Sequence, residues 1–331
     1  MINKEKAYIF DGPFAEYCAM YVDYKKALGY KFQASSYYRL RQFDDFFKEY
    51  KLNQQRLTKK MVDDYVQKRG TESPKTQHQR MSTIRQFARF MNTLGFNYYV
   101  FPKSQFVKKS NDYVPYIFTH EEMAQIWPIV DNLGYSPKSP YAHLIYPMLL
   151  RMVYGCGLRI NEALALQKTD FDLDNGLITV KKAKNNTTRF IPMSDSLTVY
   201  CRGYIKKMSF DMNTDGYFYP APDGWRYNSG SILCGFRNIL RKAGIIANNT
   251  TVPRVHDLRH TFAVHALEKM VREGQDIYYA LPILQTYMGH RDVESTEKYL
   301  RLTSDAYSHI INSTATMYHD VFPEVTEDES V

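Results

Sequence analysis

The second half of the chain contains charged side chains at spacings that suit the binding of a phosphate group. Arg159 follows the turn Gly155-Cys156-Gly157 and begins an otherwise apolar segment, with Glu162 three residues further on. A guanidinium offers five N–H donors in a planar fork, and the start of a helix adds backbone N–H groups for an anion. The same spacing also occurs in weak surface ion pairs, so an Arg159–Glu162 pair on the surface remains an alternative.

A second group lies in the segment VHDLRHTFAVHA, residues 255–266. On a helix, His256 and Arg259 lie on the same side, so both can face one phosphate. His256 and His260, with Asp257 between them, also resemble a shortened zinc-protease motif. A catalytic zinc needs a third ligand and a base, and Arg259 would place a fixed positive charge beside the cation. We therefore favour a phosphate-binding helix and expect no metal.

A third group lies in the segment YMGHRDVESTEKYLRL, where Tyr299 follows His290 by nine residues. A tyrosine at a helical position is usually a core aromatic, and this chain contains 28 tyrosines. The spacing alone therefore does not distinguish a functional Tyr299 from one that only packs in the core.

Taken together, the order and the intervals of these motifs closely resemble the tyrosine recombinase (phage integrase) family. The resemblance rests on Arg159 in GLRINEAL, on His256 and Arg259 in HDLRHTFA, on His290 in YMGH and on Tyr299. It implies an enzyme that cleaves and rejoins DNA strands by transesterification, through a 3′-phosphotyrosyl intermediate. It also implies that the reaction needs neither a metal nor any other cofactor.

The resemblance implies a role for each of these side chains. Arg159 and Arg259 would bind the nonbridging oxygens of the scissile phosphate, and His290 would add a hydrogen bond to the same group. Tyr299 would be the nucleophile, and His256 would assist the loss of its proton.

The family also uses a lysine in a β-hairpin to protonate the leaving 5′ oxygen. Counting back from the sequence RFIP, this lysine falls on Lys184, but the glycines that flank it in the family are absent here. Lys181 and Lys182 therefore remain alternatives. Glu162 matches an acidic residue of the family, and we expect Glu162 and Asp257 to support the arginines and histidines of the site.

The N-terminal third must supply much of the DNA contact if the resemblance holds. Apolar residues recur there at three- and four-residue intervals, which predicts amphipathic helices over residues 1–95 that resemble the family's SAM-like core-binding domain. The first 110 residues hold 21 Lys and Arg against 10 Asp and Glu, which favours a phosphate-rich partner, although charge also serves solubility. Arg80, Arg85 and Arg89 are expected on the solvent face of one helix, as candidate DNA contacts.

The remaining segments complete the predicted architecture. Residues 96–116 contain prolines and the pair Lys108-Lys109, lack a helical period, and are predicted to be a linker that contacts DNA. Residues 117–302 correspond to the catalytic domain, with a small antiparallel hairpin on either side of Asn185-Asn186. Residues 303–331 combine a helix with an acidic tail, and by resemblance we expect the helix to dock on a neighbouring protomer rather than on its own domain.

The expected fold is therefore mainly α, a helical core-binding domain followed by an α+β catalytic domain with a small antiparallel sheet. Four scattered cysteines, the lack of a secretory signal and the lack of an apolar run of about 18 residues predict a cytoplasmic protein with no membrane contact, located at the nucleoid when bound to DNA.

By resemblance, the expected partners are double-stranded DNA with a specific recombination site, further copies of the chain in a tetramer, and an accessory directionality factor. Integration or excision of a mobile element is the expected function. Chromosome-dimer resolution, DNA inversion and relaxation by a type IB topoisomerase are the alternatives.

Overall fold

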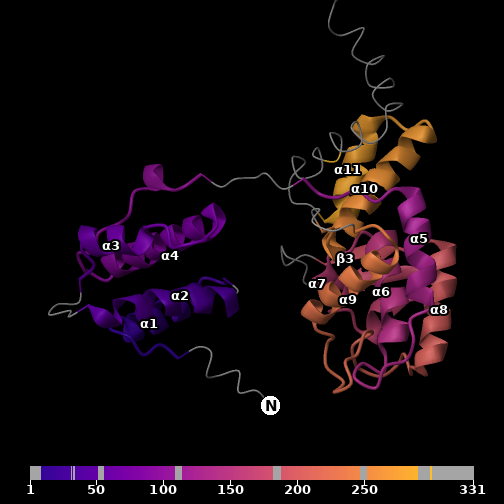
Figure 1. Cartoon of the computed structure of the whole chain (residues 1–331), viewed down its shortest axis with the longest axis horizontal. Helices are drawn as coiled ribbons and strands as arrows, with labels where there is room; N and C mark the ends of the chain where they lie inside the picture. The colour runs from indigo at the N-terminus through magenta and orange to yellow at the C-terminus, as the bar shows by residue number, and fades with distance from the viewer. Residues whose placement is uncertain are drawn as a thin grey trace, which may run out of the picture. The chain divides into compact units, whose positions relative to one another are not determined.

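The computed structural model divides the 331-residue chain into two compact units, Met1–Tyr113 and Val114–Val331, which we call the N-terminal and the C-terminal unit. Figure 1 shows the helices of each unit. Within the part of the chain that the structure describes, no helix is long and apolar enough to cross a membrane. The described residues are 9–30, 32, 34–50, 56–108, 114–181, 188–246, 252–289 and 299.

The N-terminal unit is helical, and its helices begin where the sequence provides caps. The Thr58 side chain accepts a hydrogen bond from the backbone N of Met61, in the helix that begins at Lys59, and Ser73 does the same for Thr76, in the helix that begins at Pro74. Such caps satisfy N–H groups that have no partner within the helix. The elements are α1 (Ala15–Ala27), α2 (Ala34–Phe46), the 3-10 turn η2 (Phe47–Glu49), α3 (Lys59–Val66), α4 (Pro74–Thr93) and the 3-10 turn η3 (Lys103–Gln105).

An aromatic cluster forms the core of this unit. The ring of Phe14 lies 5.3 Å from that of Phe43, 5.5 Å from that of Phe47 and 6.1 Å from that of Phe87, measured between centroids. Tyr98 and Phe101 are also buried in this core. The predicted linker segment 96–116 thus contributes at least these two aromatic side chains to the core of the N-terminal unit.

The C-terminal unit is mostly helical and carries one small sheet, which confirms the predicted fold class. Its first helix begins at a capping box, in which the side chains of Thr119 and Glu122 each accept a hydrogen bond from the other's backbone N. The elements are α5 (His120–Asp131), α6 (Ala142–Gly155), α7 (Ile160–Ala163), the 3-10 turn η4 (Lys168–Asp170), β1 (Phe171–Asp172), β2 (Leu177–Val180), β3 (Arg189–Pro192), α8 (Asp195–Met208), α9 (Ser229–Lys242), α10 (Val255–Arg272) and α11 (Ile277–Met288).

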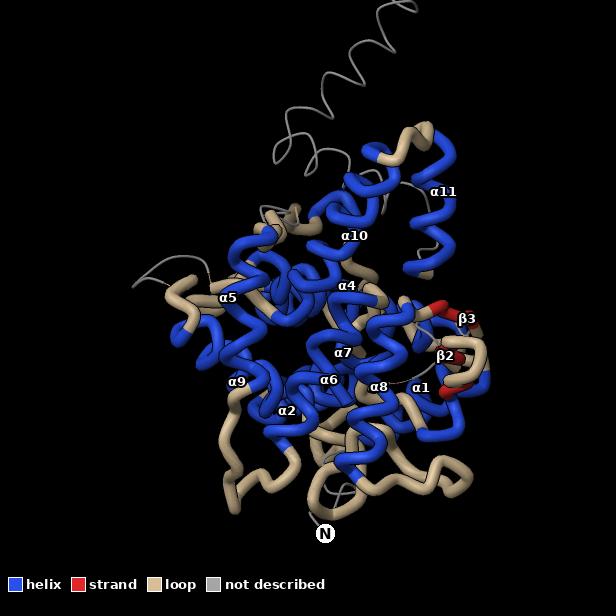
Figure 2. The backbone as a smooth tube through the Cα atoms, turned by 90° about the vertical axis from the view of Figure 1, so that its right-hand side faces the viewer, coloured by secondary structure: helices blue, strands red, loops and turns tan. Residues whose placement is uncertain are grey.

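Helix α10 connects two apolar clusters of this unit. Near its start, Leu258 belongs to the large core that surrounds α6, and further along Val264 and Leu267 pack in a second cluster with residues of α11. Figure 2 shows α10 and α11 side by side. Helix α10 begins at Val255, directly before His256, and α11 ends at Met288. The buried faces of α10 therefore fix how its polar residues are presented.

The sheet has the order β1-β2-β3, and β2 pairs antiparallel with β3. Ile178 lies opposite Ile191 and both are buried, whereas Phe190 points outward and is 69% exposed. Arg189 is the first residue of β3 and pairs with Val180. The predicted antiparallel strands are confirmed, while the turn between them, residues 182–187, lies outside the described residues.

Candidate active site

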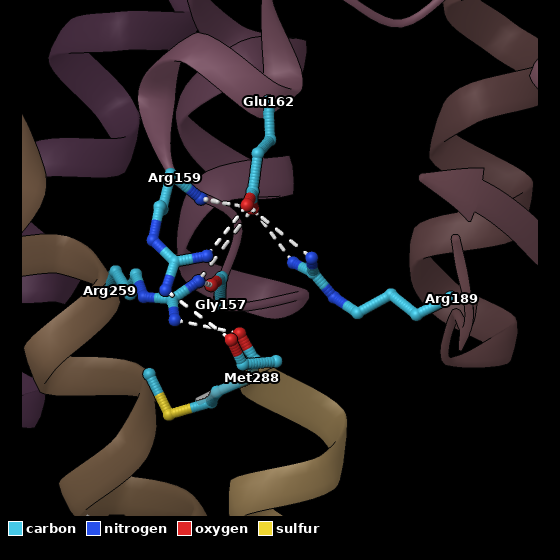
Figure 3. A network of polar contacts seen from close by, with 7 residues as sticks. Gly157, Arg159, Glu162, Arg189, Arg259 and Met288 are labelled. Atoms are coloured by element: carbon cyan, nitrogen blue, oxygen red, sulfur yellow. Dashed lines mark hydrogen bonds and ion pairs between the residues drawn. The ribbon is translucent and has the colours of Figure 1, made fainter. Parts of the chain in front are cut away.

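Arg159 is held at the start of α7 by Glu162, as Figure 3 shows. Gly157 has φ +56°, and this left-handed conformation lets the chain turn between α6 and α7. Arg159 is the N-cap, and the Glu162 carboxylate accepts hydrogen bonds from its backbone N at 3.1 Å and from its Nη1 at 2.7 Å. Part of the Arg159 side chain remains accessible, since 24% of it is exposed.

Arg259, on α10, is almost fully enclosed, with 1% exposure. Its Nη1 donates to the carbonyl oxygen of Gly157 at 2.5 Å, and its Nη2 donates to that of Met288 at 2.8 Å. These carbonyls belong to the turn after α6 and to the end of α11, so the two segments together orient the guanidinium (Figure 3). Burial lowers the pKa of Arg259 to about 10, with the charge of Arg159 acting in the same direction. The side chain is therefore still cationic at neutral pH.

A third arginine, Arg189 of β3, faces the same carboxylate. Its Nη2 lies 2.7 Å from Glu162 Oε2, and Arg259 Nη1 lies 3.8 Å from the same oxygen. Burial alone would raise the pKa of Glu162, but the hydrogen bonds and charges of Arg189 and Arg159 outweigh it and lower this pKa to about 2. One ionised carboxylate therefore stands among three guanidinium groups that come from α7, β3 and α10.

Arg189 is not among the residues predicted from the sequence, where the surrounding RFIP motif serves only to locate the hairpin lysine. The sequence signal is a charged residue beside the apolar residues Phe190 and Ile191 in a short predicted strand, and this signal does not identify a partner 27 residues away.

The histidines of α10 differ in their surroundings. Asp257 is fully buried and accepts a hydrogen bond from the backbone N of Arg254 at 2.7 Å, so it caps the helix. Burial lowers the pKa of His256 to about 4, together with the charges of Arg259 and Arg254. His256 is therefore neutral at neutral pH, and its ring lies edge-on to that of His260 with 4.8 Å between the centroids.

Tyr299 lies next to this helix, and its side chain is 3% exposed. Its hydroxyl is 3.0 Å from Nδ1 of His260. Burial raises the pKa of Tyr299, while the nearby charges of Arg259 and Arg159 lower it. By family resemblance, His256 is expected to assist the loss of the Tyr299 proton, whereas the histidine in contact with the Tyr299 hydroxyl in the structure is His260.

Comparison with known proteins decides what this cluster belongs to. The phage integrase family matches residues 117–305, more than half of the chain. The chain belongs to this family. It is a tyrosine recombinase, an enzyme that cleaves and rejoins DNA strands.

Individual relatives are similar to this chain over most of its length. A putative integrase/recombinase, y4rE, of Sinorhizobium fredii (strain NGR234) is 28% identical over 292 residues, which cover 85% of this chain and 89% of that protein. XerH site-specific recombinase bound to palindromic difH substrate superposes with a TM-score of 0.61 at 17% identity, over 86% of this chain and 80% of that one. The Tn1549 transposon integrase in complex with a circular intermediate DNA superposes with a TM-score of 0.60 at 15% identity, over 86% of this chain and 94% of that one. The two structures show a shared fold.

Several residues that the sequence analysis assigned to the recombinase site fall outside the described residues. They are His290 and two of the hairpin lysines, Lys182 and Lys184. Lys181, the third lysine considered, forms an ion pair with Asp170, with 2.6 Å between Nζ and Oδ1.

The basic residues predicted to contact DNA in the N-terminal unit separate into different classes. Arg80 is 2% exposed and forms an ion pair with Glu72 at 2.6 Å, so it does not lie on the solvent face on which the sequence placed it. A buried guanidinium needs several acceptors, and Arg80 also donates to backbone carbonyls. Arg85 is half-buried and donates to the Phe101 carbonyl, whereas Arg89 is exposed. Lys108 is exposed as well, and Lys109 lies outside the described residues.

Proposed function

We propose that this tyrosine recombinase binds the scissile phosphate of DNA beside Arg159 and Arg259, and that Tyr299 attacks the phosphorus. The observation that carries the proposal is the cluster of three arginines around the single carboxylate of Glu162. Three cations and one anion leave a surplus of about two positive charges, which suits a phosphodiester whose negative charge grows in the transition state. Arg159 is the most accessible of the three and is suited to direct contact.

The remaining roles follow the family resemblance and the surroundings of each group. His256 is neutral at working pH and would donate one hydrogen bond to a nonbridging oxygen. His290 would donate another. Lys184 would protonate the leaving 5′ oxygen, with Lys182 as the alternative, because Lys181 is already paired with Asp170.

Site-specific recombination for the integration or excision of a mobile element is the function we propose for the whole chain. The Tn1549 transposon integrase supports it as a protein of similar fold. Chromosome-dimer resolution is the second candidate, because XerH, bound to difH, shares the fold as well. The two functions differ in product: excision gives a circle with joined ends, and resolution converts a dimeric chromosome to monomers. Sequencing of the junctions formed in cells that express the protein distinguishes them.

We further propose that the basic N-terminal unit binds duplex DNA, with Arg89 and Lys108 exposed for contact, and that residues 117–302 perform the chemistry. Synapsis of two sites would require four protomers, with the segment 303–331 joining neighbours. An accessory factor would set direction. The predicted segment 303–331 lies outside the described residues.

The catalytic proposal is tested by trapping the covalent intermediate. The substrates are nicked duplexes that together cover the DNA flanking the gene. After cleavage, the short fragment that carries the free 5′ hydroxyl dissociates. Rejoining is then blocked and the covalent adduct accumulates. The expected result is a 3′-phosphotyrosyl adduct with the wild type and with Tyr279→Phe, a matched control at a 75% exposed tyrosine of α11. Tyr299→Phe is expected to form none. An adduct that survives Tyr299→Phe, or no adduct from the wild type on any duplex, contradicts the proposal.

A further inference from the structure

We propose that His260 is a catalytic residue that takes the proton of Tyr299 during cleavage and returns it during rejoining. The inference rests on the proposed role of Tyr299 as nucleophile and deepens it. The carrying observation is the 3.0 Å contact between His260 Nδ1 and the Tyr299 hydroxyl. This is the distance at which a general base must lie from the proton that it removes.

The position of His260 follows from the helix that carries it. It lies one turn after His256 on α10, beside the fully buried residues Leu258 and Arg259 that hold the helix in place. Tyr299 packs in the second apolar cluster, which also contains Val264 of the same helix. The phenol is therefore enclosed on its apolar side, and its hydroxyl is directed at a half-buried imidazole.

His256 is less suited to this proton transfer. Burial and the charges of Arg259 and Arg254 lower its pKa to about 4, and a base this weak accepts a proton from a phenol poorly. Its place beside Arg259 suits hydrogen bonding to the phosphate. The two histidines would thus divide the work, His256 on the phosphate and His260 on the nucleophile.

The proposed step is balanced in atoms and charge. The O–H bond of Tyr299 breaks, and the proton goes to the lone pair of His260 Nδ1. The phenolic oxygen forms a bond to phosphorus while the bond from phosphorus to the 5′ oxygen breaks, and that oxygen takes a proton from the hairpin lysine. Rejoining runs through the same transfers in reverse. Arg259 and Arg159 favour the developing phenolate, because their charges lower the pKa of Tyr299 against the effect of burial.

The test separates the nucleophile side of the reaction from the leaving-group side. Single-turnover cleavage is measured on an ordinary phosphodiester and on a substrate with sulfur in place of the bridging 5′ oxygen. A thiolate leaves without needing a proton, so the sulfur substrate restores cleavage only to a variant that lacks the general acid. We expect His260→Ala to slow cleavage by about 100-fold or more on both substrates, with unchanged affinity for DNA. If His260→Ala cleaved the sulfur substrate at the wild-type rate, the assignment of His260 as the base would be overturned.

A second variant distinguishes a base from a residue that only positions the tyrosine. His260→Asn keeps a polar atom near the place of Nδ1 but cannot accept a proton at neutral pH. We expect it to remain as slow as His260→Ala, because asparagine can hold the tyrosine in place but cannot take its proton. Full activity of His260→Asn would overturn the role as base.

The matched control lies on the same helix. His265 Nδ1 is 2.9 Å from the hydroxyl of Tyr154, a second histidine–tyrosine pair of α10 outside the proposed site. His265→Asn is expected to retain the wild-type cleavage rate. If the wild type forms an adduct and His260→Ala cleaves within about threefold of it, only the present inference fails. If the wild type forms no adduct at all, the proposed function fails as well.

Discussion

Glu162 is the single negative group among three arginines, so its neutralisation should destabilise the protein in a measurable and pH-dependent way. The change Glu162→Gln keeps the size of the side chain and part of its hydrogen bonding. It leaves Arg159, Arg189 and Arg259 without a counter-charge. The change is made in a shielded place, since only 9% of the Glu162 side chain is exposed. Uncompensated buried charge is among the costlier changes in a protein interior.

The size of the effect follows from the pKa of Glu162, which lies at about 2 instead of its ordinary 4.5. A shift of this size corresponds to about 3 kcal/mol of stability that the ionised carboxylate contributes near neutral pH. Because the pKa is depressed in the folded protein, the contribution is complete above the unfolded pKa. It is lost as the pH falls from about 5 to about 2, and at about pH 3 roughly half remains.

Urea unfolding of the full chain measures this contribution. Both tryptophans, Trp127 and Trp225, lie in the C-terminal unit, so tryptophan fluorescence reports the unfolding of the unit that contains Glu162. We expect the unfolding free energy of Glu162→Gln to lie about 3 kcal/mol below that of the wild type at about pH 7, and the gap to shrink by about half at about pH 3.

A surface ion pair of the same unit provides the control for this prediction. Asp131 makes a two-pronged pair with Arg151, at 2.7 Å for each oxygen, but 40% of the Asp131 side chain is exposed. Asp131→Asn should cost less than about 1 kcal/mol, since solvent screens the pair. The reasoning is refuted if the two variants lose equal stability, or if the gap between Glu162→Gln and the wild type does not change with pH.

Two further predictions concern residues that shape the two units. Gly157→Ala should lower the unfolding free energy by more than about 1 kcal/mol, because φ is +56° and an added Cβ would lie 2.4 Å from the Phe262 ring. Gly134→Ala, which meets nothing within 4 Å, should be neutral in the same fluorescence assay. Arg80→Ala should destabilise the N-terminal unit by about 3–5 kcal/mol, and the exposed Arg89→Ala by less than about 0.5, measured by hydrogen exchange of α4. Equal effects within either pair would contradict the burial on which these predictions rest.

Local patterns in the sequence predicted the local features of the fold. The capping box at Thr119 and Glu122 involves residues three apart, and the strands on either side of Asn185-Asn186 are short runs rich in β-branched and other apolar residues. Leu40, Phe43 and Phe47 follow a helical interval and are buried as that interval predicts. Each of these features depends on neighbours in the chain, which is the information a single sequence contains.

The features that the sequence did not predict depend on contacts between distant segments. Arg80 has the spacing of a solvent-face residue on α4, but its partners come from α3 and the turn after it. Tyr98 follows a helix in a segment without period and packs nonetheless in the aromatic core. The contact of His260 with Tyr299 spans 39 residues. No spacing rule distinguishes His260 from His256 as the partner of that tyrosine.

Glu162 shows why the motif GLRINEAL has two interpretations when taken alone. With Arg159 as its only partner, the carboxylate would form the weak surface pair that the spacing allows. The approach of Arg189 and Arg259 from two other elements changes this, because it buries the carboxylate and holds it ionised among cations that would otherwise repel one another. The arginines are thereby kept close together before any phosphate is bound. The carboxylate thus does more than brace one helix: it sets the spacing of the charges on which the proposed chemistry depends.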